Sequence, residues 1–305
     1  MREGFGETHP IVNIIFYLAV VSLTVTTFHP VLLGISFLGA VLYLGRLISM
    51  REVVSYLLRL ALPAFLVLAV INPLFNHRGM TVLFYLPGGN AFTFESVIYG
   101  LVMGLMVVDI IVWSACFSKV LTTDKCVYLF SIFSPGFSLV LSMVFRFVPR
   151  FGRILSEAYE ARVISGDGGP VASGVRAVGK ASTYALERSA VTADSMTDRG
   201  YGTGRRTSFS LFVFRRRDAG ILVFIAAFFS LYMAGFFNGF SKAYYEPYIE
   251  FARDALTPAS LAVFAAFACV CAVPFAVSMA EEIRFGKSVK NVGETDRGGY
   301  RLWER

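Results

Sequence analysis

The stretch "SVIYGLVMGLMVVDIIVWSACFS" (96–118) contains a single charged residue, Asp109, and is long enough to cross a lipid bilayer. A transmembrane helix needs roughly 20 mostly apolar residues, because its backbone polar groups must be satisfied within the segment. The composition agrees with such a span: of the 305 residues, 56% are hydrophobic and only 16% are charged, whereas about a quarter of the residues of a soluble domain are charged. The sequence therefore predicts an all-α membrane protein.

Other nearly uncharged runs repeat this pattern on both sides of the opening stretch. They lie at 11–28, 30–45, 60–75, 126–145, 219–241 and 255–280. The run 60–75 contains Pro63 and Pro73. Because proline disturbs the hydrogen bonds of a helix interior, we expect a kink or a tilt in this run.

Small and acidic residues interrupt the apolar pattern of 96–118. Gly100 and Gly104 form a GxxxG pair, which either lets another helix approach closely or arises by chance in a glycine-rich membrane chain. Asp109 is an acidic residue at membrane depth, and such residues mark an ion path or a pairing between helices. Since Asp109 lies towards one end of the run, a structural hydrogen bond is the favoured interpretation.

The run 126–145 decides the topology, because "SPG" (134–136) interrupts its centre and leaves each half too short to span a membrane. We interpret it as a helical hairpin or a tilted helix at the cytoplasmic membrane surface. About five to six transmembrane helices then remain, with both termini in the cytoplasm. In this topology 25 of the 28 lysine and arginine residues are cytoplasmic, as the positive-inside tendency favours, and the exceptions are Arg78, Lys242 and Arg253.

This topology divides the chain into four parts. They are a four-span transmembrane region at 1–118, a cytoplasmic or interfacial region of long helices at 119–217, C-terminal transmembrane helices at 218–280 and a basic cytoplasmic tail at 281–305. The region 119–217 carries 15 basic and seven acidic residues, in a chain whose net charge is +7. Basic residues near a bilayer attract anionic lipid headgroups by about 1 kcal/mol each, which accounts for part of this excess.

Two segments of the basic region end in an arginine close to glycine. The first, "RFGRILSEAYEARVIS" (150–165), has apolar residues at helical spacing, so we expect a helix with Arg162 in its last turn and a stop at Gly166. The second, "RAVGKASTYALERSAVTADSMTDR" (176–199), is followed by "GYGTG", and we expect Arg199 in its last turn. A cation at a helix C-terminus is favoured by about 0.3–1 kcal/mol, so this placement alone requires no function.

The same residues carry a resemblance to a known family. "EARVISG" (160–166) and "ADSMTDRGYGTGRRTSF" (193–209) resemble the paired Ala-Arg-Gly motifs of the transmembrane T component of energy-coupling factor (ECF) transporters, a cobalt-transport permease-like family. The likeness extends to "THPIVNIIFYL" (8–18) before the first span, and to the order of spans, long cytoplasmic helices and returning spans. The second motif is the more specific of the two.

The resemblance implies a non-catalytic scaffold in the cell membrane of a prokaryote, with no cofactor, metal or nucleic acid of its own. In this family two ABC-type ATPase subunits bind the cytoplasmic face and hydrolyse ATP. A small membrane-embedded substrate-binding (S) subunit chooses the vitamin or transition-metal ion and packs against the T component. The motif arginines lie at the tips of coupling helices and dock on the ATPases. Carried over to this chain, the ATPase-coupling residues are Ala161, Arg162, Asp198, Arg199 and Gly200.

The chain departs from the family pattern at two positions. Val163 stands where the first motif has glycine, so we expect the first helix to run on to Gly166. Asp198 stands where the second motif has alanine. Because it adjoins Arg199, Asp198 would orient the guanidinium group or lower the charge presented to the ATPase.

Two other classes of membrane protein remain as alternatives, a stand-alone secondary permease and an intramembrane enzyme. A permease is expected to show an internal repeat, and an enzyme to place convergent catalytic groups at membrane depth; neither pattern is present in the sequence. The four cysteines have no CxxC spacing and the three histidines are isolated, so neither set predicts a metal site. These residues are Cys116, Cys126, Cys269, Cys271, His9, His29 and His77. The chain has no Walker A sequence, and ATP would therefore be bound by partner subunits.

Overall fold

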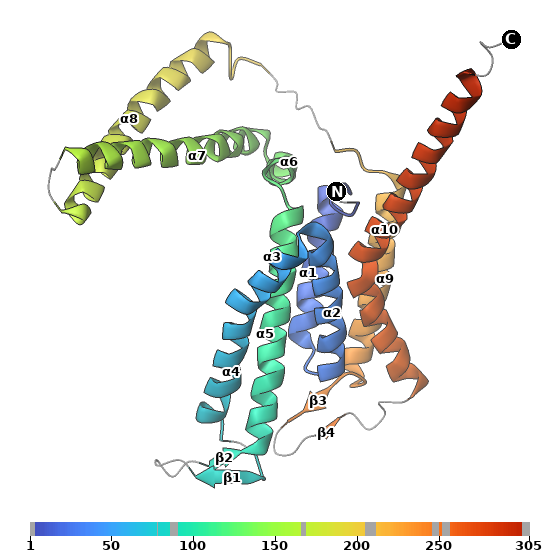
Figure 1. Cartoon of the computed structure of the whole chain (residues 1–305). Helices are drawn as coiled ribbons and strands as arrows, with labels where there is room; N and C mark the ends of the chain where they lie inside the picture. The colour runs from blue at the N-terminus through green and yellow to red at the C-terminus, as the bar shows by residue number, and fades with distance from the viewer. Residues whose placement is uncertain are drawn as a thin grey trace. The chain divides into compact units, whose positions relative to one another are not determined.

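The chain folds almost entirely into helices in the computed structural model (Figure 1). The structure describes residues 4–77, 79–85, 91–165, 169–204, 212–245, 250–251 and 257–300. Two compact units are present. Unit 1 comprises Met1–Thr122 and Phe214–Arg305, and unit 2 comprises Thr123–Val213.

Unit 1 is a bundle of apolar helices. In chain order they are α1 (Pro10–Thr26), α2 (Pro30–Leu47), α3 (Met50–Tyr56), a π-helical turn η1 (Leu57–Ala61), α4 (Leu62–Phe75), α5 (Phe94–Val120), α9 (Arg216–Phe237) and α10 (Pro258–Tyr300). Within the described ranges, five helical segments are long and apolar enough to cross a membrane: Pro30–Leu47, Met50–Phe75, Phe94–Val120, Arg216–Phe237 and Pro258–Phe285. The apolar helix α1 is shorter, at 17 residues. The predicted all-α, multi-pass membrane protein is therefore confirmed, and its environment is a lipid bilayer.

Short antiparallel strand pairs join some of these helices. They are β1 (Val82–Tyr85) with β2 (Ala91–Thr93), between α4 and α5, and β3 (Ala243–Tyr244) with β4 (Glu250–Phe251), between α9 and α10. The base of the first pair is fixed by Glu95, whose carboxylate accepts hydrogen bonds from the backbone N–H (3.1 Å) and the hydroxyl (2.6 Å) of Thr81. Strands this short leave no alternating pattern in the sequence, and they were not predicted.

The GxxxG pair of α5 brings this helix against α4. A Cβ atom at Gly100 would lie 3.3 Å from the carbonyl oxygen of Ala69, and one at Gly104 would lie 3.0 Å from the ring of Phe65. A side chain at either position would meet the neighbouring helix, so the small size of the two glycines permits the contact. Of the two interpretations of this spacing, the close approach of another helix is confirmed.

The segment Met50–Phe75 contains a π-helical turn just before the first of its two prolines. The helix is continuous, but in η1 the N–H group of Leu62 bonds to the carbonyl of Leu57, five residues earlier. This turn directly precedes Pro63, whose ring would clash with the carbonyl four residues earlier in a regular helix. A π-helical turn opens the backbone at that point, whereas Pro73 is contained within α4.

The centre of unit 1 is packed around the indole ring of Trp113 in α5. This ring makes edge contacts with Phe16 and Tyr17 of α1, with centroid distances of 5.7 and 6.3 Å. Its Nε1 donates a hydrogen bond to Ser36 Oγ of α2 at 3.0 Å. Because lipid is as apolar as these side chains, such packing and hydrogen bonding, rather than the hydrophobic effect, hold α1, α2 and α5 together.

Unit 2 consists of α6 (Thr123–Phe133), α7 (Pro135–Ile164) and α8 (Pro170–Asp198). The run 126–145 is broken at Ser134, whose Oγ accepts a hydrogen bond from the N–H of Phe137 at the start of α7. Helices α6 and α7 pack on each other, and the Ser138 hydroxyl donates to the Val127 carbonyl at 3.2 Å. The predicted break at "SPG" is thus confirmed, and the run forms α6 and the first part of α7.

Several helices extend beyond their predicted ends. Helix α7 begins at Pro135 rather than near residue 150, and α8 begins at Pro170 rather than at residue 176. Proline is favoured in the first turn of a helix, where its missing N–H leaves no hydrogen bond unmade. Helix α10 continues to Tyr300, so most of the predicted tail 281–305 is helical.

Candidate functional site

Helices α7 and α8 of unit 2 carry both predicted motifs and pack against each other (Figure 1). Helix α8 buries three small residues, Ser173, Ala177 and Ala181, each at most 1% exposed. They are four residues apart and form one ridge along the helix. Small side chains on this ridge let the two helices approach closely.

The first motif forms the C-terminal end of α7. Arg162 lies in the last turn, as predicted, and is half-buried, while Ala161 is exposed. The helix ends at Ile164, and Ser165 is its C-cap: the N–H and the hydroxyl of Ser165 bond to the Ala161 carbonyl at 3.2 and 2.8 Å. The expected stop at Gly166 lies outside the described residues. The helix thus continues past Val163, which stands where the family motif has glycine, and is capped by a serine.

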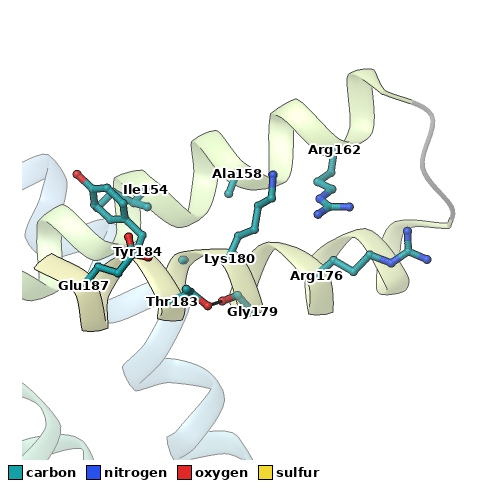
Figure 2. A pocket seen from close by; sticks show the side chains of 10 residues that line it. Ile154, Ala158, Arg162, Arg176, Gly179, Lys180, Thr183, Tyr184 and Glu187 are labelled. Carbon is teal, nitrogen blue, oxygen red and sulfur yellow. Dashed lines mark hydrogen bonds between the residues drawn. The ribbon is translucent and has the colours of Figure 1, made fainter.

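A groove of about 630 Å³ lies between α7 and α8, and Arg162 lines it (Figure 2). Arg176 and Lys180 of α8 lie towards the same end of the groove as Arg162. Tyr184 and Glu187 lie towards the opposite end. Three cationic side chains therefore line this end of the groove, beside Arg162. Arg176 and Lys180 were not predicted as site residues, although their spacing of four on one helix was an available signal.

The second motif forms the C-terminal end of α8. The helix ends at Asp198, and Arg199 is its C-cap, one residue beyond the last turn in which it was predicted. Gly200 follows with a φ of 76°. The N–H groups of Gly200 and of the next residue bond back to carbonyls in the last turn of α8, at 2.9 and 3.0 Å. This is a Schellman motif, which requires a left-handed residue directly after the cap, and it confirms the predicted glycine stop.

The three motif residues at this end, Asp198, Arg199 and Gly200, are all exposed. Within the described ranges, the side chains of Asp198 and Arg199 form no ion pair with each other. The contact by which Asp198 would orient the guanidinium group is therefore not formed. Arg199 is an exposed cation at the tip of a long helix.

The structure does not bring the two motif arginines together. Helices α7 and α8 run in opposite directions along their contact, so Arg162 lies near the start of α8 and Arg199 at its far end. With 29 residues at 1.5 Å each, α8 is about 43 Å long. The two arginines consequently lie on separate surfaces.

Buried and charged contacts surround the start of α9, where the chain returns from unit 2 to unit 1. Asp218, in the first turn, is 2% exposed, and Arg217 forms an ion pair with Glu281 of α10. The ring of His9 packs on that of Phe214 with a centroid distance of 5.3 Å. Burial lowers the pKa of His9 below its ordinary value, and the negative charge of Asp218 opposes this shift. These contacts fix the point at which the segment after unit 2 joins the bundle.

The described part of the chain holds neither a metal-binding cluster nor a disulfide bond. It contains no cluster of three or more His, Cys, Asp or Glu side chains able to hold a metal ion. The cysteines are free thiols, of which Cys116 and Cys271 are buried and Cys126 and Cys269 partly buried.

Comparison with known proteins does not identify a family. No family model matches the chain, and no curated protein matches it. The likeness to the T component therefore depends on the residues of the two motifs and on the order of the helices.

Proposed function

We propose that this chain is the transmembrane coupling subunit of an ECF-type ABC importer. Two ABC-type ATPase subunits bind and hydrolyse ATP, and a small membrane-embedded S subunit binds the vitamin or transition-metal ion that is imported. The chain itself is not an enzyme, and α7 and α8 transmit the movement of the ATPases to the S subunit. The complex lies in the cytoplasmic membrane of a prokaryote, with unit 2 and both termini in the cytoplasm.

The observation that carries this proposal is the C-terminal end of α8. The residues that resemble the family motif are the ones that build a rigid helix tip, because Gly200 supplies the left-handed conformation that ends the helix directly after Arg199. A guanidinium group offers five donors in a planar fork and stays charged. Such a group on a fixed helix end suits paired hydrogen bonds with carboxylate or backbone oxygens of a partner.

The separation of the two arginines also supports two ATPase partners. Arg162 lies in the last turn of α7 and lines the groove with residues from 176–187 of α8, whereas Arg199 caps the far end of α8. In the proposal each arginine docks on a different ATPase subunit. The groove beside Arg162 adds Arg176 and Lys180 to the surface offered to the first of these subunits.

The proposal is tested by uptake measurements on the assembled complex, using Arg162→Ala, Arg199→Ala and the double variant. Removing one partner of a buried charge pair costs about 3–5 kcal/mol, so we expect each single change to weaken ATPase binding roughly a hundredfold or more. The double change should abolish ATP-driven uptake. Matched controls are Arg153→Ala and Arg188→Ala, exposed arginines in the interiors of the same two helices, which should retain uptake. Full uptake by the double variant at normal expression would contradict the proposal.

Co-purification separates this proposal from the alternatives. The tagged full chain is expected to bring down two ABC-type ATPase subunits and a small membrane protein. A stand-alone permease or an intramembrane enzyme would purify without ATPases.

A further inference from the structure

A fully buried carboxyl group lies inside unit 1. Asp109 stands near the middle of α5, not towards its end, and is 0% exposed. No described residue forms an ion pair with it, and its Oδ1 atom has no hydrogen-bond partner. An ionised carboxylate at this position would be costly, because it would have exchanged water for an apolar interior without a compensating positive charge.

The groups around Asp109 are polar but uncharged, and they come from four helices. Oγ1 of Thr24 in α1 lies 3.4 Å from Asp109 Oδ2, and the hydroxyl of Ser36 in α2 lies beside the same carboxyl group. The thiols of Cys116 in α5 and Cys271 in α10 are close enough to interact with it electrostatically. Thr24 and Ser36 are both 0% exposed. The surroundings supply hydroxyl and thiol groups, and none of these is a cation.

The Thr24 hydroxyl has two acceptors within hydrogen-bond distance. Its one hydrogen can bond to the carbonyl of Val20 at 3.0 Å or to Asp109 Oδ2 at 3.4 Å. Even when the longer of these bonds forms, Oδ1 of Asp109 has no hydrogen-bond donor among the described residues, and a carboxyl group with so few donors in an apolar interior is less costly in its neutral, protonated form.

We propose that Asp109 is a proton-binding site of unit 1, whose carboxyl group is protonated while α5 is packed against Thr24 of α1. A divalent metal ion is a poorer occupant, because Mg²⁺ and Ca²⁺ take six or more oxygen ligands, and the carboxyl group with Thr24 and Ser36 offers fewer. Any rearrangement that separates α1 from α5 and admits water releases the proton, since an aspartate in water is ionised at neutral pH. The inference does not depend on the proposed transport function.

Infrared difference spectroscopy on the purified full chain in lipid nanodiscs at neutral pH tests this site. Exposed carboxylates are ionised at this pH, so the C=O stretching band of a protonated carboxylic acid reports a buried group. We expect this band in the wild type and its loss in Asp109→Asn. The matched control Asp194→Asn, at an exposed aspartate of α8, should retain it. A wild-type spectrum that lacks the band, or a band that persists in Asp109→Asn, would overturn the proposal.

Variants at Thr24 test the hydrogen bond without altering the carboxyl group. Thr24→Val removes the hydroxyl group beside the carboxyl group and should change the frequency of the band without abolishing it, whereas Thr24→Ser keeps the hydroxyl group and should leave the frequency close to that of the wild type. This comparison remains informative if Asp109→Asn fails to fold. An unchanged band in Thr24→Val would contradict the assignment of the band to a carboxyl group beside Thr24, and loss of the wild-type band on addition of sodium would identify a cation site instead.

Discussion

Units 1 and 2 are both helical, but they bury their side chains to very different extents. In unit 1, α5 buries residues along its whole length, from Glu95 to Val120. In unit 2, no described side chain of α7 is buried, and α8 buries only its ridge of Ser173, Ala177 and Ala181. Most of the stability of a helix comes from packing its apolar face. The comparison shows that unit 1 fixes its shape by its own contacts, whereas most of the helical surface of unit 2 is exposed.

Part of that surface of unit 2 is apolar. Ile164 at the end of α7 is 86% exposed, and Val171 and Leu186 of α8 are 80% and 72% exposed. Exposed apolar groups that gather on one element mark surfaces that contact lipid or another protein.

The largest effect is expected where unit 1 is packed most tightly. Replacing both Gly100 and Gly104 by alanine should force α4 away from α5, and overpacking of this kind costs about 1–3 kcal/mol at each position. The melting temperature of the purified chain in detergent should fall. Gly34→Ala is the matched control, because a Cβ atom there meets nothing within 4 Å. If the double variant melted like the control, the α4–α5 contact would be looser than described.

A smaller and more local effect is expected in unit 2. Ala181 is 1% exposed on the ridge between α7 and α8, so Ala181→Leu should push the two helices apart at a cost of about 1–3 kcal/mol. Amide hydrogen exchange should become faster in α7 and α8 and stay unchanged in unit 1. Ala190→Leu, at an exposed position of α8, should leave exchange unchanged. Faster exchange in both units would show that their stabilities are not separate.

The smallest effect is expected at the tip of α8. Gly200→Ala places a side chain at a φ of 76°, a conformation that costs an L-residue about 1 kcal/mol. The last turn of α8 should fray, which hydrogen exchange of residues 195–199 measures, and the position of Arg199 should become less defined. Gly204→Ala is the control, since the φ of Gly204 is not positive. Equal exchange in the two variants would mean that the Schellman motif does not hold the tip.

The features that could be predicted from the sequence are those set by local chemistry. The apolar runs indicated the spans, "SPG" (134–136) indicated the break before α7, and the glycine after Arg199 indicated the end of α8. Each depends on a few neighbouring residues, such as a proline that cannot donate a hydrogen bond or a glycine that tolerates a positive φ. These are properties of the chain itself.

The features that were missed depend on contacts between distant residues. The closeness of Arg162 to Arg176 and Lys180 arises only when α8 folds back along α7. Asp109 was interpreted from its place in one apolar run, whereas its surroundings are made by α1, α2 and α10. A pattern along one helix shows which residues face inward, but it does not show which helix they meet.

The π-helical turn η1 has a consequence for how unit 1 tolerates changes in length. It inserts one extra residue, which corresponds to a rotation of about 100° around the helix axis. All side chains of α4 are turned by this angle relative to a regular continuation of α3, and in this orientation Phe65 and Ala69 meet the two glycines of α5. Deleting a single residue within Leu57–Ala61 would leave the span apolar and long enough to cross the bilayer, yet it would present the wrong side of α4 to its neighbour.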